Sequence, residues 1–117
     1  MSDSYFGRLF GRGSNSRIFS ANIAESEGFD TPAPIPSLPG WTVWKKGQTE
    51  IYVITHNLEL SDPTRQMHIV ATPKNYNAIL SISSVDRNEF TVSTWNFNGA
   101  TTRSAFMFIA IYYPKAR

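Results

Sequence analysis

The chain contains no cysteine and few charged residues, and both absences narrow what the protein can be. Without cysteine there is no disulfide framework and no thiolate ligand for a metal. Charged residues make up 17% of the 117 residues, and the formal net charge is +2. Strong electrostatic binding to nucleic acid needs a clustered stripe of Lys and Arg, and no such run occurs. We therefore expect no nucleic-acid partner.

The sequence also lacks a long hydrophobic run. Its longest apolar stretch is the nine residues from Ala105 to Tyr113, whereas a membrane-spanning helix needs about 20. The first eight residues have no basic start followed by an apolar run, so they do not read as a signal peptide. We expect a soluble protein with no membrane partner.

Residues 1–40 differ in composition from the rest of the chain. They are rich in Gly, Ser and Pro, and four prolines fall within residues 32–39. Such dense proline favours an extended, polyproline-like chain over a helix interior or a central strand. The composition predicts an extended arm over residues 1–40, followed by a folded domain over residues 41–117.

Single aromatic residues are spaced along this predicted arm. A purely solvating tail is depleted in such groups, so their presence indicates side chains that fill pockets on a neighbouring protein. The alternative is a terminus with no partner. The predicted anchors are Phe6, Phe10, Phe19 and Phe29.

Residues 41–117 carry strand signals throughout. The whole chain has three Trp, five Tyr and eight Phe, a composition that suits β-structure. Turn residues (Gly, Pro, Asn and Asp) separate the apolar stretches, and no helical period is evident. The pattern predicts an all-β fold, a small antiparallel β-sandwich with an extended N-terminal arm. The six candidate strands are Trp41–Lys45, Thr49–His56, Gln66–Thr72, Ala78–Val85, Glu89–Phe97 and Ser104–Tyr113.

The last candidate strand is apolar on both faces. Phe106, Phe108 and Tyr112 share one face, and Met107 and Ile109 lie on the other. A strand of this kind must be covered on both sides, and a module of this size has little left to cover the second side. We therefore predict a homo-oligomer, with Phe106, Phe108 and Tyr112 at the interface.

Few residues suggest catalysis or metal binding. His56 and His68 are the only histidines, and with Glu50 they could hold a metal if their strands were adjacent. Two scattered histidines fit equally well as polar residues of two strands. No serine sits in a Gly-x-Ser-x-Gly elbow. We expect no catalytic site, no metal and no cofactor.

Aromatic and amide residues suggest binding of a sugar. Trp and Tyr rings offer flat faces for stacking, and Asn side chains supply hydrogen bonds, although Trp and Tyr on strands are also typical of a core. The loop at residues 96–103 is polar, as ligand-contacting loops often are. The candidate ligand-binding residues are Trp95, Asn96, Asn98 and Arg103.

Four short segments resemble modules of phage tail fibres and related virion proteins. Residues 47–58 read Gly-Gln-Thr-Glu-Ile-Tyr-Val-Ile-Thr-His-Asn-Leu, and residues 67–73 read Met-His-Ile-Val-Ala-Thr-Pro. A Phe-Thr-Val core follows at residues 90–92, and Phe-Met-Phe-Ile-Ala-Ile at residues 106–111. This pattern is similar to the small sandwich that includes the H-type-lectin-like domains. The match covers about residues 47–113, and it departs from the family at Glu59, where Gly is common.

The resemblance implies a trimeric sandwich in a virion. The expected function is therefore a non-enzymatic structural protein of a phage particle, located in the virion as a tail fibre or adaptor, or as a capsid decoration (cement) protein. Its arm would bind a neighbouring capsid or tail protein. The alternative is a carbohydrate-binding module that recognises a host surface glycan, and a catalytic domain is the third reading.

Overall fold

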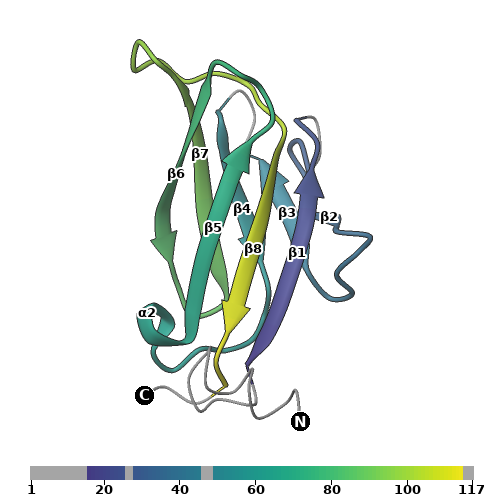
Figure 1. Ribbon diagram of the computed structural model, residues 1–117. Coiled ribbons are helices and arrows are strands. Elements are labelled where there is room, and N and C mark those ends of the chain that lie inside the picture. Colours follow the sequence, from purple (N-terminus) through teal and green to yellow (C-terminus); the bar gives the residue numbers. More distant parts are fainter. Residues whose placement is uncertain (1–15, 26–27, 46–48, 115–117) are drawn as a thin grey trace, which may run out of the picture.

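Two antiparallel sheets pack face to face in the computed structural model, which describes residues 16–25, 28–45 and 49–114 (Figure 1). The smaller sheet has the strand order β1-β8-β5 and the larger one β2-β3-β4-β7-β6. The predicted antiparallel β-sandwich is confirmed. The smaller sheet contains β1 (Arg17–Ile23), β5 (Met67–Pro73) and β8 (Phe106–Tyr112). The larger sheet contains β2 (Ala33–Pro34), β3 (Thr42–Lys45), β4 (Ile51–Thr55), β6 (Ala78–Val85) and β7 (Glu89–Asn96).

A short helix leads into β5. This helix, α2 (Pro63–Gln66), begins with a proline in its first turn, where the missing N–H costs nothing. The Gln66 side chain is buried and bonds to both sides of the helix. Its Oε1 accepts from the Asp62 N–H at 2.8 Å, and its Nε2 donates to the Pro114 carbonyl at 2.8 Å. The helix therefore ties the start of β5 to the segment that follows β8.

Aromatic rings from both sheets fill the space between them. Trp41 stacks on Phe108 with ring centroids 6.0 Å apart, and Phe90 meets Phe108 edge-on at 5.3 Å. At the other end of the core, Tyr52 lies edge-on to Phe106 at 5.1 Å. All five side chains are buried. Edge-on and offset pairs of this kind add to the hydrophobic contribution of the buried area.

The sandwich extends into the stretch predicted to be an arm. Residues 17–23 form β1, which pairs with β8 over its whole length. In β1, Ala21 and Ile23 are buried whereas Ser20 and Asn22 are exposed, which is the period-2 alternation of a half-buried strand. The low complexity of residues 1–40 taken together concealed this local pattern. The expected boundary at residue 40 is therefore corrected by a strand that begins at Arg17.

The proline-rich stretch folds onto the core and does not act as a spacer. Ile35 and Leu38 are buried, and the Ile35 N–H donates to the Trp41 carbonyl at 3.0 Å. Pro34 lies in β2, an edge strand of the larger sheet, where proline removes no ladder hydrogen bond. The prolines thus lie on either side of Ile35 and Leu38, the two residues of this turn that pack into the core.

We expect deletion of residues 1–40 to destabilise the domain strongly. The truncated chain would lose β1 and with it the partly buried Phe19 and the buried Ile23, and Ile23 alone contributes about 1.5 to 3 kcal/mol, a large part of the stability of a small domain. A chain that lacks only residues 1–15 keeps every strand of the described residues and should unfold at the denaturant midpoint of the full chain. Equal midpoints for the 41–117 chain and the full chain would show that β1 contributes nothing.

Candidate functional site

The predicted interface residues of the last strand lie inside the sandwich. Phe106 and Phe108 are buried, and the half-buried Tyr112 has its ring centroid 6.5 Å from that of Phe19. The large rings fill the space between the sheets, so they are not available to a partner. The prediction that this strand is apolar on both faces is correct, but the face turned to solvent is opposite to the one predicted.

The outward side chains of the smaller sheet form a regular surface, here called the outer face. The strand registers place these side chains in three rows across β1, β8 and β5. Val70 is 69% exposed and Ile18 63% exposed, and Met107 and Ile109 are also exposed. The rows are Ile18, Ile111 and His68; Ser20, Ile109 and Val70; and Asn22, Met107 and Thr72.

The outer face carries no Lys, Arg, Asp or Glu. Five of its nine side chains are apolar, and three others are neutral amide or hydroxyl groups. His68 is the remaining member, and its ring lies 5.2 Å from that of Tyr113. Soluble proteins usually place charges on a solvent-facing sheet, and a contiguous exposed apolar surface is typical of an interaction site.

The predicted ligand-binding residues lie at one end of the sandwich, and they differ in exposure and in their hydrogen bonds. Trp95 is exposed, and Asn98 is exposed in the turn that follows β7. The Asn96 side chain builds this turn, because its Oδ1 accepts from the backbone N–H groups of Asn98 and Ala100 at 2.9 and 3.1 Å. Arg103 Nε lies 3.8 Å from Glu50 Oε2. Trp95 and Asn98 thus remain available to a ligand, whereas Asn96 holds the loop.

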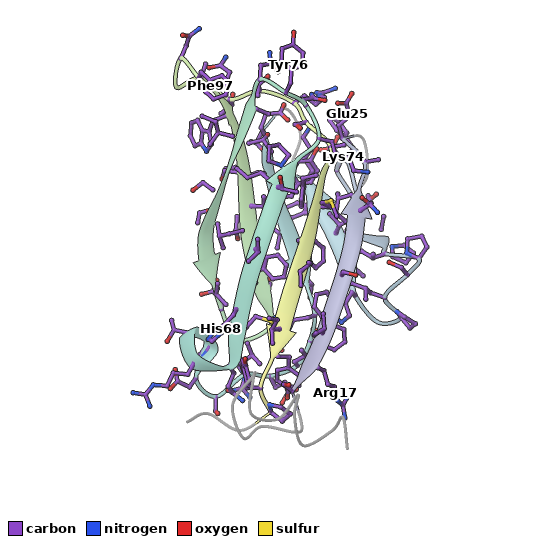
Figure 2. The ribbon with its side chains drawn as sticks, viewed as in Figure 1. Arg17, Glu25, His68, Lys74, Tyr76 and Phe97 are labelled. Atoms are coloured by element: carbon purple, nitrogen blue, oxygen red, sulfur yellow. The ribbon has the colours of Figure 1, made fainter. Side chains whose placement is uncertain are left out.

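Two further aromatic side chains project from the same end. Tyr76 is 96% exposed and Phe97 69% exposed, and Figure 2 shows both at the end opposite to Arg17 and His68. Together with Trp95 they are called the aromatic end. Tyr76 is not among the candidate ligand-binding residues predicted from the sequence, and neither is Phe97. Its position beside an Asn-Gly turn is the signal that marks it as exposed.

The predicted arm anchors have different environments. Phe19 packs inside the sandwich, 4.8 Å from the ring of Trp41, so it does not reach a neighbouring protein. Phe29 is 38% exposed, and Lys45 Nζ lies 5.4 Å from the centre of its ring. Phe6 and Phe10 lie outside the described residues.

A buried ion pair lies beneath Phe29. Lys45 Nζ is 3.1 Å from Glu50 Oε1, and both side chains are buried. Neither atom makes a hydrogen bond of good angle with a described residue, so charge attraction holds the pair. Burial, followed by the Glu50 carboxylate, raises the pKa of Tyr52 to about 12. The Tyr52 hydroxyl therefore stays protonated and donates to the Glu25 carbonyl at 2.8 Å.

A glycine at position 28 allows the backbone there to lie directly against β3. Gly28 has φ +70°, and a Cβ there would lie 2.4 Å from the Val43 carbonyl oxygen. The Gly28 carbonyl accepts from the Lys45 N–H at 2.8 Å. Only glycine permits this approach, which fixes the segment before β2 against β3.

The two histidines do not form a metal site. His56 follows β4 of the larger sheet and is buried, whereas His68 is exposed on the outer face of the smaller sheet. Within residues 16–25, 28–45 and 49–114, no group of three or more His, Cys, Asp or Glu side chains is placed to hold a metal ion. The arrangement of His56, His68 and Glu50 considered from the sequence is therefore absent.

His56 is a structural residue of the core. Its Nδ1 accepts from the Leu58 N–H at 3.0 Å, so the neutral ring carries its proton on Nε2. The ring centroid is 5.6 Å from that of Trp41. Burial lowers the pKa of His56 from 6.5 to about 4, because the core disfavours the charged form.

The protein should lose stability as the pH falls from 6.5 to 4. In this range the unfolded chain binds a proton at His56 and the folded chain does not, so each pH unit costs up to about 1.4 kcal/mol of unfolding free energy. In His56→Asn the side-chain oxygen can still accept from Leu58, but the titrating ring is gone. Urea unfolding at pH 7 and pH 4.5 should show a smaller pH effect in this variant than in the wild type. An equal pH effect in both proteins would contradict this assignment.

No helix among the described residues is long and apolar enough to cross a membrane. Comparison of the chain with family models, with curated proteins and with solved structures found no match.

Proposed function

We propose that this protein is a non-enzymatic structural component of a phage virion that assembles into a homotrimer through the outer face of its smaller sheet. The virion role follows the resemblance of residues 47–113 to phage tail-fibre modules, as does the number of three copies. The observation that supports self-association is the outer face, which has no charged side chain and exposes Ile18, Val70, Met107 and Ile109.

The absence of charge favours a second copy of the same chain as the partner. In a symmetric trimer the side chains nearest the three-fold axis meet their own copies, so a charge there would face like charges, and such pairs destabilise the contact. Neutral side chains avoid this cost. Burial of exposed apolar groups contributes about 25 cal/mol per Å², and a small domain gains stability from such burial.

Residues 1–15 are the remaining candidate for attachment to a neighbouring capsid or tail protein. The two Phe-Gly-Arg repeats at residues 6–8 and 10–12 fall in this stretch. The attachment role proposed for the arm is thus narrowed to the part of the chain before β1. Tail-fibre, adaptor and decoration roles are all consistent with this arrangement.

Light scattering coupled to size exclusion tests the self-association of the full chain. The wild type should elute with a mass about three times the 13.2 kDa of one chain. Ile109→Lys and Val70→Lys should elute at the monomer mass, because each places a charge in the central row of the outer face. Both side chains are exposed in the single chain, so we expect both variants to fold.

The matched control is Ser81→Lys, which adds the same charge to an exposed position of β6 in the larger sheet. This variant should keep the wild-type mass. A wild-type monomer at all protein concentrations would overturn the proposal.

A second candidate function is recognition of a host surface saccharide by the aromatic end. Its support is the exposure of Trp95 at the end of β7 and of Tyr76 and Phe97 on the adjoining loops, which are held in place by hydrogen bonds. The Asn75 side chain donates to the Arg103 carbonyl at 3.0 Å and links the two loops. Exposed rings on preorganised loops bind at a low cost in conformational entropy.

A glycan array tests this second function. The full chain should bind at least one saccharide, and Tyr76→Ala and Trp95→Ala should each weaken that binding about tenfold or more. Trp44→Phe is the matched control, because β4 separates the strand of Trp44, β3, from the strand of Trp95, β7. No binding to the array would exclude the saccharide function and leave the self-association proposal unchanged.

A further inference from the structure

His68 is the only titratable side chain among the nine members of the outer face. It lies on β5 in the same row as Ile111 of β8 and Ile18 of β1. Its backbone position is fixed, because β5 pairs with β8 from Met67 to Pro73. Any partner that covers this row also covers the imidazole ring.

Within residues 16–25, 28–45 and 49–114, no acidic side chain forms an ion pair with His68. Ile111 is the neighbour of His68 in the row. The strand that follows β5 in the sequence, β6, has no titratable residue between Ala78 and Val85. Tyr113 contributes a ring at 5.2 Å. From α2 the charged neighbour is Arg65, whose Nε lies 3.6 Å from the carboxylate of Asp62, and Arg17 begins β1 at the same end of the sheet.

We infer that self-association through the outer face depends on pH, with His68 as the group that controls it. This inference rests on the proposed self-association. Contact with a second copy removes water from the His68 ring and places apolar side chains around it. An imidazolium loses its hydration there and gains no carboxylate from the outer face, so association requires the neutral ring.

The size of the effect follows from proton linkage. Imidazole side chains change charge between about pH 5 and pH 8. If only the neutral ring can be buried, the association constant falls as the pH falls through this range, by up to about tenfold per pH unit for each His68 that the contact covers. The assembly is then stable at neutral pH and dissociates in mild acid.

Sedimentation equilibrium of the full chain at pH 7.5 and pH 5.5 tests this inference. The wild type should associate at pH 7.5 and dissociate at pH 5.5 at the same protein concentration. His68→Asn keeps a neutral polar side chain at this position and should associate equally at both pH values. Circular dichroism at pH 5.5 confirms that the chains remain folded.

The second histidine provides the matched control. His56→Asn removes the other titrating ring, which is buried in the core, and should keep the pH-dependent association of the wild type. Association of the wild type with equal strength at both pH values would overturn the role of His68 while leaving self-association intact. A monomer at both pH values would instead overturn the proposed self-association itself. Loss of pH dependence in His56→Asn would assign the effect to the core.

Discussion

The structure depends on the central position of β8 in the smaller sheet. This strand is apolar on both sides and hydrogen-bonded to a neighbour along each edge, β1 on one and β5 on the other. Its inner side chains Phe106, Phe108 and Ala110 are buried against the larger sheet. Its outer side chains remain for a further contact. The core, the placement of β1 and the outer face all follow from where this one strand lies.

The six strands of residues 41–114 could be predicted because each is bounded by turn residues and carries aromatic or β-branched side chains. The predicted range Ala78–Val85 coincides with β6, and the other five agree with their strands to within two residues at either end. The strand β1 was not predicted. Its alternation is evident only when the pairs Ala21 and Ile23, and Ser20 and Asn22, are read apart from the Gly- and Ser-rich residues before them. Composition averaged over 40 residues conceals a seven-residue strand.

The candidate sites were predicted less well, and the reason is physical. Periodicity divides the residues of the last strand into two sets, but it does not say which set meets the other sheet. Packing decides this, because the rings of Trp41 and Phe90 leave a space that Phe108 fills. Similarly, no local pattern distinguishes an asparagine that binds a ligand from one that holds its own loop. Asn96 does the second, and only its hydrogen bonds to Asn98 and Ala100 reveal it.

The position of His68 follows only when the sequence and the strand register are considered together. The sequence shows a histidine on a strand, and the register of β5 with β8 places it in a row with Ile111. Only the two facts together put a titratable ring at the margin of an apolar surface. The same ring one residue along the strand would face the core, where His56 already shows how burial changes an imidazole.

The buried pair of Lys45 and Glu50 constrains how this chain can change over generations. Loss of Glu50 alone leaves the Lys45 charge buried without a counterion, which costs about 3 to 5 kcal/mol, whereas replacement of both by apolar residues is close to neutral. Loss of Lys45 alone leaves Glu50 with Arg103, whose Nε lies 3.8 Å from its carboxylate. A path that removes Glu50 first therefore passes through an unstable intermediate, and a path that removes Lys45 first does not. The two positions should vary together among descendants of this chain, with Lys45 replaced before Glu50.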